Sequence, residues 1–257
     1  MEISPRTKAK PTMKCSTLRI KAVLFDVGNT LVHSHPEVTF QRILAAHGVA
    51  KPLEEVREAL IRGNAEFDID KHEGLSAHEF YTQWNIVQLK HLDLKGSRAK
   101  RLAGEIESKW WKFEQVHVFK DVKETLQRLK QMGLKLGIIT GGFEEDIEAI
   151  MLKTGLEDLF DVKVGVNTTG KRKPHPKAFK HALKQLCIKP SEAIFVGDNL
   201  KADYEGAEKA GMTPILIRRK SSSTQRLFTD VCLRLPSEIR TIQRLDEIFD
   251  VLKTVNP

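Results

Sequence analysis

The run KAVLFD at residues 21–26 decides the fold, because this short, β-rich apolar stretch ends abruptly in an acid. An unbroken apolar run of this length is typical of a strand that is buried on both faces, as in a parallel sheet. Asp26 then stands at the carboxyl end of the strand. The sequence therefore predicts a buried strand that delivers a carboxylate to the edge of a sheet.

After residue 118 the sequence alternates between two patterns. Apolar residues at three- and four-residue spacing predict helices, and short β-rich runs between them predict strands. The predicted helices are 122–131, 144–154, 176–187 and 201–210, and the predicted strands are 134–140, 162–166, 193–198 and 214–218. Such alternation implies an α/β fold with a parallel sheet and helices on both faces. Residues 220–224 are expected to form a loop, and residues 231–255 a further strand and a closing helix at 245–252.

Between the first strand and residue 115 the pattern is helical throughout. Apolar spacing predicts helices at 38–47, 53–67, 77–92 and 98–113, with no strand among them. We therefore predict three parts: a loose tail at 1–18, an α/β core formed by 19–34 and 116–257, and an all-helical insertion at 35–115.

Composition excludes several classes of protein. The 257 residues are 40% hydrophobic and 30% charged, which is not typical of collagen-like, disordered or disulfide-stapled chains. The sequence has no apolar stretch near the ~18 residues that a membrane span needs, and residues 1–19 lack the apolar core of a secretory signal. We expect a cytoplasmic protein with no membrane partner. Cys15, Cys187 and Cys232 are odd in number and far apart, which predicts neither a disulfide set nor a zinc site.

The formal net charge of +8 raises the question of a nucleic-acid partner. Lysine and glutamate are interleaved along most helical segments, a pattern that marks solvated helix faces. We therefore do not expect nucleic acid as a partner. A small anionic substrate fits the charge equally well.

Polar residues gather where the predicted strands end. Asp26 follows the first strand, Thr140 and two glycines follow the second, and Asp198 follows another, with Asp203 five positions further on. Lys173 lies in a basic loop before the helix at 176–187. In an open parallel sheet the carboxyl ends of the strands border a crevice, so these side chains are expected to meet there.

These residue types suit a hard cation and a phosphate group. Magnesium prefers oxygen ligands such as the carboxylates of Asp26 and Asp198. Asp26 can attack phosphorus and form an aspartyl-phosphate, which splits one difficult step into two. Thr140 and the amide of Gly141 can bind phosphate oxygens. Lys173 would neutralise charge on the nucleophile and the phosphoryl group.

Each of these features has a plainer interpretation. Thr140 and its glycines can be a simple strand-to-helix turn, and Asp203 can cap the helix that follows Asn199. Lys171 and Arg172 are expected to be solvated loop charges. The aromatic residues of the insertion are expected to serve as core or interdomain contacts: Trp84, Trp110, Trp111 and Phe113.

Four ordered motifs resemble those of the haloacid dehalogenase-like (HAD) hydrolase superfamily. They are FDVGNTL at 25–31, ITGG at 139–142, KPHP at 173–176, and VGDNLKADYEGA at 196–207 followed by AGM at 210–212. The resemblance spans residues 21–218, and the helical insertion lies where that family carries its type-one cap. It implies a Rossmann-like core with a helical cap at 35–115.

The resemblance also implies roles for individual residues. Asp26 would be the nucleophile, Asp198 a Mg²⁺ ligand and Asp203 a supporting acid at the metal. Thr140 and Lys173 would be phosphate partners. Most members of the family are phosphatases that act on small phosphorylated metabolites, so the expected substrate is of that kind.

The sequence departs from the family pattern at Gly28. Phosphatases of the family carry a second aspartate there, which protonates the leaving oxygen and then activates water. A backbone carbonyl at Gly28 can still bind the metal, but its side chain cannot transfer a proton, a contribution typically worth ~10²–10⁴ in rate. We expect slow hydrolysis that favours leaving groups of low pKa. His33, His35 and Glu144 are the nearest candidates for a substitute acid.

Two other functions remain open from the sequence. Dehalogenase branches of the family also lack the second aspartate and form an ester on the residue that matches Asp26. The cation-binding pair of Asp198 and Asp203 is not required for that reaction. The other alternative is a non-catalytic protein that binds phosphate and metal and has lost its acid at Gly28.

Overall fold

The protein is described by a computed structural model over residues 20–219 and 239–255. Six strands form one sheet in the order β5-β4-β1-β6-β7-β8, and every neighbouring pair is parallel. The strands are β1 (Ala22–Phe25), β4 (Lys135–Ile139), β5 (Val162–Val164), β6 (Ala193–Gly197), β7 (Thr213–Ile217) and β8 (Thr241–Ile242). The predicted α/β fold with a parallel sheet is confirmed. The predicted tail at 1–18 and loop at 220–224, and Cys15 and Cys232, lie outside the described residues.

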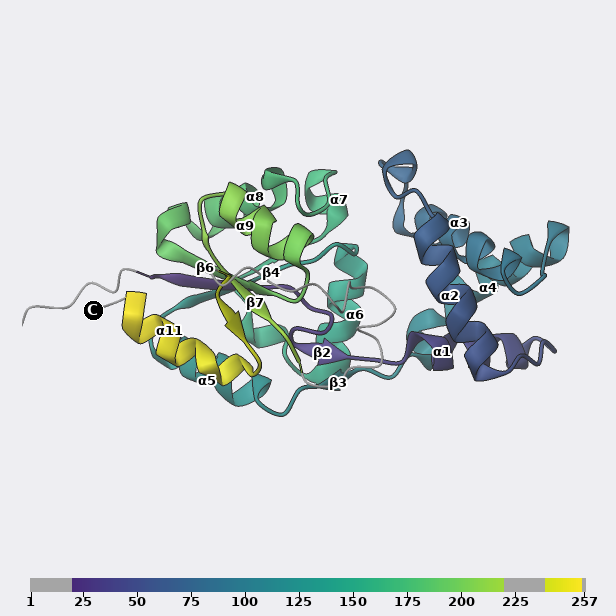
Figure 1. Ribbon diagram of the computed structural model, residues 1–257, viewed down its shortest axis with the longest axis horizontal. Coiled ribbons are helices and arrows are strands. Elements are labelled where there is room, and N and C mark those ends of the chain that lie inside the picture. The colour runs from purple at the N-terminus through teal and green to yellow at the C-terminus, as the bar shows by residue number, and fades with distance from the viewer. Residues whose placement is uncertain (1–19, 220–238, 256–257) are drawn as a thin grey trace, which may run out of the picture.

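Side chains of β1 alternate between the two faces of the sheet, as the period of a strand requires. Val23 and Phe25 join one apolar cluster, and Ala22 and Leu24 join the other. The first cluster is covered by α5 (Val122–Gln131), α6 (Glu144–Thr154) and α11 (Ile248–Val255), and the second by α8 (Pro176–Leu186) and α9 (Gly206–Lys209). Figure 1 shows the sheet between these two helical layers.

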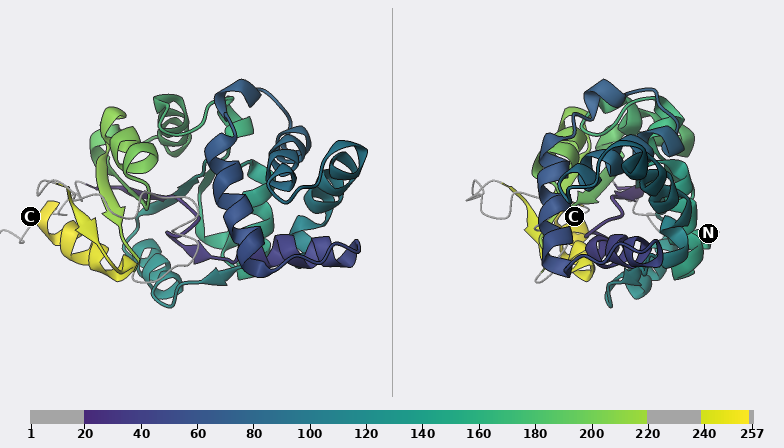
Figure 2. Two further views of the ribbon diagram at one scale, coloured as in Figure 1. Left: turned by 45° about the vertical axis from the view of Figure 1, so that its right-hand side comes forward. Right: turned by 90° about the vertical axis from the view of Figure 1, so that its right-hand side faces the viewer.

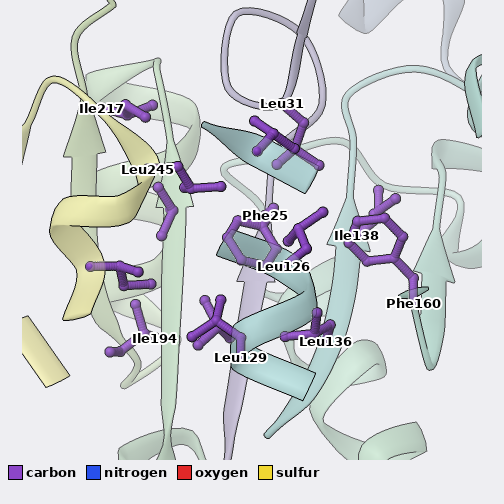
Figure 3. Packing of buried hydrophobic residues seen from close by; sticks show 14 of the residues in the cluster. Phe25, Leu31, Leu126, Leu129, Leu136, Ile138, Phe160, Ile194, Ile217 and Leu245 are labelled. Carbon is purple, nitrogen blue, oxygen red and sulfur yellow. The ribbon is translucent and has the colours of Figure 1, made fainter. Parts of the chain in front are cut away.

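The first of these clusters is built around Phe25. Figure 3 shows its ring among side chains from α5 and from the neighbouring strands, including Leu126 and Ile138. The ring of Phe160 meets it edge-on, with 6.4 Å between the ring centroids. Because β1 is buried on both faces, Asp26 is held at a fixed place at its end.

Four helices form a separate helical unit: α1 (Pro36–Ala46), α2 (Leu53–Glu66), α3 (Ala77–Lys90) and α4 (Gly96–Phe113). They enclose their own apolar cluster, which includes Phe40, Leu89 and Ile106. Figures 1 and 2 show this helical unit standing beside the sheet and its covering helices. No helix among residues 20–219 and 239–255 combines the length and the apolar character needed to cross a membrane.

Two short strands, β2 (Val32–His33) and β3 (His117–Val118), pair antiparallel at the base of the helical unit. They tie together the two chain segments that run between the sheet and the helical unit. The sequence did not predict them, because two residues are too few to show a periodic pattern.

Two elements near the site differ from the sequence prediction. The strand predicted at 162–166 ends at Val164, because α7 (Val166–Thr169) begins there and Gly165 N donates to Thr168 Oγ1 at 2.9 Å. The helix predicted at 201–210 is divided into a π-helical segment at Leu200–Glu205 and α9. Isolated π turns of this kind are frequent at functional sites.

Candidate active site

Asp26 lies directly beyond β1. Its amide donates to the carbonyl of Val196 at 2.9 Å, so the hydrogen bonding between β1 and β6 continues for one more residue. The chain then turns sharply, with Leu31 N donating to Val27 O at 2.9 Å. Asn29 adopts a left-handed conformation in this turn, with φ of 53°. The turn directs the carboxylate of Asp26 toward the end of the neighbouring strand β6.

Lys173 joins Asp26 to Asp203 in a buried ion-pair network. Its ammonium lies 2.6 Å from Asp26 Oδ1 and 2.6 Å from Asp203 Oδ1. The side chains are 3%, 12% and 2% exposed for Lys173, Asp26 and Asp203. A lysine held between two carboxylates away from water is not the solvated loop charge that a basic loop alone suggests.

Asp203 reaches the network because the π-helical segment folds back on the end of β6. Its Oδ2 accepts from the amide of Asn199 at 3.0 Å, and the side chain of Asn199 caps the segment by accepting from Ala202 N at 2.8 Å. Gly197 makes room for it, since a Cβ at that position would lie 2.4 Å from Asp203 Cγ. Asp203 therefore has a local structural role as well as its bond to Lys173.

Asp198 completes a group of three carboxylates. Oxygen atoms of Asp26, Asp198 and Asp203 all lie within 4.8 Å of one another. The Lys173 ammonium bonds to two of them, Asp26 and Asp203, and its charge also acts on Asp198 without a direct bond. A cluster of carboxylate oxygens with this excess of negative charge matches the ligands that Mg²⁺ prefers. The residues present therefore fit a hard divalent cation.

The electrostatics of the network follow from burial and mutual repulsion. Burial raises the pKa of Asp26 to about 6, with Lys173 opposing the shift and Asp203 adding to it. Burial, followed by the charges of Asp26 and Asp203, raises the pKa of Asp198 well above its ordinary value. Burial acts against the charged form of Lys173, but attraction to Asp203 and Asp26 outweighs it and raises its pKa. The ammonium stays charged across the physiological range.

Thr140 and Gly141 follow β4, the strand that pairs with β1. The amide of Thr140 donates to Val164 O at 3.0 Å, and its hydroxyl oxygen accepts from Gly142 N at 3.1 Å. Both Thr140 and Gly141 line a cavity, which also reaches Gly28 and Asn29. The structure thus brings the predicted phosphate-binding residues to the same edge of the sheet as Asp26.

The expectation that Arg172 is a solvated loop charge is wrong. Its guanidinium donates to the carbonyl of Gly141 and lies over the rings of Phe80, at 4.1 Å, and Phe143, at 5.2 Å. Phe80 belongs to the helical unit and Phe143 to the sheet side, so Arg172 lies between the two. Neither partner is close in sequence, and no spacing pattern points to them. Lys171 does lie at the surface, paired with Glu73 at 2.7 Å.

The cavity has a volume of about 770 Å³ and lies between the helical unit and the carboxyl end of the sheet. Its floor includes Gly28 and Thr140, and its walls include Trp84, Trp110 and Trp111. These tryptophans thus border a space that opens onto the predicted site. Phe113 packs against the apolar cluster of the helical unit, as expected.

Gly28 is exposed, and a Cβ built there would meet nothing within 4 Å. Of the three candidate substitute acids, His33 lies on the cavity wall. Burial, followed by the neighbouring His117 and His35, lowers its pKa, so its imidazole is poorly suited to donate a proton. The carboxylate of Glu144 accepts from Thr168 Oγ1, and His35 lies 3.6 Å from Glu37 at an exposed position.

A further buried acid at the cavity was not singled out by the sequence pattern. Glu114 follows α4, is 4% exposed and lines the cavity. Burial raises its pKa, while hydrogen bonds from Thr39 and Ser34 oppose the shift. A lone glutamate after a helix carries no spacing signal that would have identified it.

The sequence pattern of the haloacid dehalogenase-like hydrolases matches residues 20–211. The chain belongs to this family and is a hydrolase. The predicted resemblance is therefore confirmed, and the site described above stands at the sheet edge where the four motifs meet.

Particular relatives carry phosphatase names. A glyceraldehyde 3-phosphate phosphatase of Methanopyrus kandleri is 33% identical over 217 residues, which are 78% of this chain and 84% of that relative. The crystal structure of a HAD phosphatase from Thermococcus onnurineus has a TM-score of 0.59 and 27% identity, covering 91% of this chain and 98% of that one. A 2-haloacid dehalogenase from Pseudomonas syringae has a TM-score of 0.62 and 27% identity, covering 91% and 99%. The names of the first two of these proteins support a phosphatase within this family.

Proposed function

We propose that the protein is a Mg²⁺-dependent phosphatase that hydrolyses small phosphorylated metabolites through an aspartyl-phosphate on Asp26. The observation that carries this proposal is the buried network in which Lys173 joins Asp26 and Asp203 beside Asp198. An ion pair with a purely structural role needs only one carboxylate for each ammonium. Three carboxylates around one ammonium, at the end of a sheet and beside a cavity, are better suited to a metal and a phosphoryl group.

The chain's own residues divide the chemistry among them. Asp26 would attack phosphorus with its second carboxylate oxygen and displace the alcohol as the P–O bond breaks, while Lys173 holds Oδ1 at 2.6 Å and offsets charge on the phosphoryl group. Thr140 and the amide of Gly141 would hold phosphate oxygens and fix their orientation. Removal of water from this part of the site strengthens each of these interactions.

The residues that would hold Mg²⁺ are Asp26, Asp198, the backbone carbonyl of Gly28, and Asp203 in support. When bound, the cation offsets the charge of the carboxylates and of the phosphate oxygens. Asp203 is held by Lys173 and by the amide of Asn199, so its contribution to the metal is positional support for the neighbouring Asp198.

We assign the core to residues 19–34 and 116–257 and the cap to residues 35–115. The separate apolar cluster of the helical unit supports this division, as does the short β2–β3 pairing at its base. The cavity lies between the two parts, which supports a role of the helical unit in substrate specificity.

Gly28 limits the reaction. Since no side chain there can protonate the leaving oxygen, hydrolysis should favour leaving groups of low pKa such as acyl and aryl phosphates. General acid help is typically worth ~10²–10⁴ in rate, so alkyl phosphates should react slower by a factor of that order.

The test is a rate comparison of aryl, acyl and alkyl phosphates with Mg²⁺, using Asp26→Asn as the control. We expect turnover that falls as the leaving-group pKa rises and that disappears in Asp26→Asn. Equal rates for aryl and alkyl esters would show that a substitute acid exists. Tight phosphoester binding without turnover would favour a non-catalytic binding protein.

A second candidate function is hydrolysis of a carbon–halogen bond. Gly28 and the likeness to the Pseudomonas syringae dehalogenase favour it, whereas the cluster of Asp26, Asp198 and Asp203 favours the phosphatase. A chelator separates the two, because it would abolish phosphatase activity and leave halide displacement intact.

A further inference from the structure

The cavity is lined on one side by apolar side chains of the helical unit. Phe40 and Leu60 come from α1 and α2, Trp84 from α3, and Trp110 and Trp111 from α4. The rings of Tyr81 and Trp84 are stacked, with 5.8 Å between centroids and 19° between planes. Together these residues form an apolar wall, which we call the aromatic wall.

Several polar side chains on the same side are already bonded within the protein. Trp84 Nε1 donates to Asn64 Oδ1 at 2.9 Å, and Asn85 Nδ2 donates to the carbonyl of Ala103 at 3.3 Å. His78 Nδ1 lies 2.6 Å from Glu107 Oε2. A ligand with several hydroxyl groups would have to compete with these bonds to be recognised.

The opposite end of the cavity is polar, and charged side chains of both signs line it, among them Arg172, Glu145 and Asp146. Thr140, Gly141 and Arg172 line it, and its floor at Gly28 lies two residues from Asp26. Lys173, next to Arg172, reaches Asp26 from the same side. A phosphate placed at this end lies near Arg172 and Lys173, and the rest of the molecule must then extend toward the aromatic wall.

The volume of the cavity limits the size of the alcohol part of the substrate. About 770 Å³ falls in the range of sites that hold drug-sized ligands. A triose phosphate would leave most of the aromatic wall in contact with water. A bulky apolar group would bury that wall and release the water, which is the favourable direction of the hydrophobic effect.

We propose that this site takes phosphate monoesters whose alcohol is bulky and apolar, with an aromatic ring or a group of similar size against Trp84 and Trp110. This inference rests on the proposed phosphatase function and adds the class of its substrate. It differs from the small polar substrate that the name of the Methanopyrus kandleri relative indicates.

Binding of phosphonates tests the inference without requiring turnover. The probes are the phosphonate isosteres of phenethyl phosphate and of glycerol phosphate, in which a methylene replaces the bridging oxygen. Isothermal titration of the wild-type protein with Mg²⁺ should give tighter binding of the aromatic isostere by roughly tenfold or more, since a single methylene in an apolar pocket already discriminates about 10- to 200-fold.

Two variants distinguish loss of a binding contact in the aromatic wall from a general loss of protein stability. Trp110 and Phe113 are both partly buried aromatic residues in the last turn of α4, and both pack against the apolar cluster of the helical unit. Trp110 lines the cavity and Phe113 does not. Trp110→Ala should lose the preference for the aromatic isostere, whereas Phe113→Ala should keep it, with melting temperatures measured for both.

The outcomes distinguish this inference from the proposed function. Equal or tighter binding of the glycerol isostere to the wild-type protein would overturn the inference, whatever the catalytic activity and whether or not the variants fold. Rates on phenethyl phosphate and glycerol phosphate, whose alcohols are both primary alkyl leaving groups, test the proposed function separately. A preference for the aromatic isostere with no turnover of any ester would support the apolar substrate class and contradict the phosphatase.

Discussion

The two sides of the cavity differ in how their polar side chains are arranged. On the sheet side, Asp26, Asp198 and Asp203 face one another around a single lysine, and burial raises the pKa of the first two. On the side of the helical unit, polar groups such as Asn64 are paired off, and aromatic rings form the wall. The sheet side thus presents charged groups that can bind a metal and a phosphate. The helical unit offers shape and apolar surface to the rest of a substrate.

The largest expected effect comes from removing the cation of the charged side. Lys173→Met leaves Asp26 and Asp203 buried without their partner, and breaking a buried pair in this way typically costs about 3–5 kcal/mol. Loss of one stabilising donor also lowers kcat by roughly 10²–10³-fold. Urea unfolding and steady-state rates measure the two effects.

Lys171→Met is the matched control, two residues away. Lys171 lies at the surface and pairs with the exposed Glu73, so the variant should retain stability and activity. Similar losses in both variants would contradict the distinction between a buried charged network and solvated loop charges.

Gly28→Asp should produce the next largest effect, and in the direction of gain. A Cβ at Gly28 meets no atom within 4 Å, so the first side-chain atom of an aspartate displaces no neighbour. A carboxyl group there can protonate the leaving oxygen, and kcat on alkyl phosphates should rise by about 10²-fold. Gly28→Asn provides the control, because it has nearly the same size but no acidic proton; an equal gain in Gly28→Asn would rule out proton transfer.

Magnesium should stabilise the charged side by relieving repulsion among its carboxylates. At a concentration one hundred times its Kd, a ligand that binds only the folded state stabilises it by about 2.7 kcal/mol. We expect the melting temperature to rise when Mg²⁺ is added and to return to its metal-free value after chelation. Asp198→Asn should lose most of this rise, and an unchanged response in that variant would place the metal elsewhere.

The smallest effect concerns Glu114, a buried acid at the border of the two sides. Its pKa is raised above the ordinary value of 4.5, mainly by burial, so the folded state holds this proton more tightly than the unfolded state. Its contribution to stability is therefore present at low pH and is lost as pH rises above 4.5. Glu114→Gln should melt a few degrees above the wild type near pH 8 and lose this advantage toward pH 4.5.

Glu105→Gln, in the helix α4 that precedes Glu114, supplies the comparison for that profile. Lys109 lowers the pKa of Glu105, so neutralising it should have the opposite pH trend and a weak effect at an exposed position. Melting curves of both variants across the pH range show whether each melting temperature, relative to the wild type, rises or falls with pH. A parallel trend in the two would show that burial of Glu114 is not the cause.

The sequence predicted the sheet side well, for a physical reason. Strands such as β1 and β6 are buried on both faces and therefore read as unbroken apolar runs, which fixes their ends to within a residue or two. Asp26 and Asp198 follow directly from those ends. Thr140 needed only the rule that carboxyl ends of parallel strands share one edge. Lys173 does not follow a strand, and its assignment depended on the basic loop before the helix at 176–187 and on the resemblance of KPHP at 173–176 to the family motif.

What the sequence missed depends on contacts between distant segments. Arg172 is held by Phe80, Phe143 and the carbonyl of Gly141, which no local pattern connects. The π-helical segment exists because Asp203 turns back to the amide of Asn199, an arrangement that helical spacing does not reveal. The aromatic wall likewise forms only when separate helices come together, so its rings were expected as core or interdomain contacts.

The central claim is that the carboxylate of Asp26 attacks phosphorus while Lys173 and its neighbours hold the charges in place. Mass spectrometry of the protein, acid-quenched during reaction with para-nitrophenyl phosphate and Mg²⁺, tests it most directly. We predict one added phosphoryl group on the peptide that contains Asp26, and neither phosphoryl group nor turnover in Asp26→Asn. Undiminished turnover in Asp26→Asn, or a phosphoryl group on another residue, would contradict it.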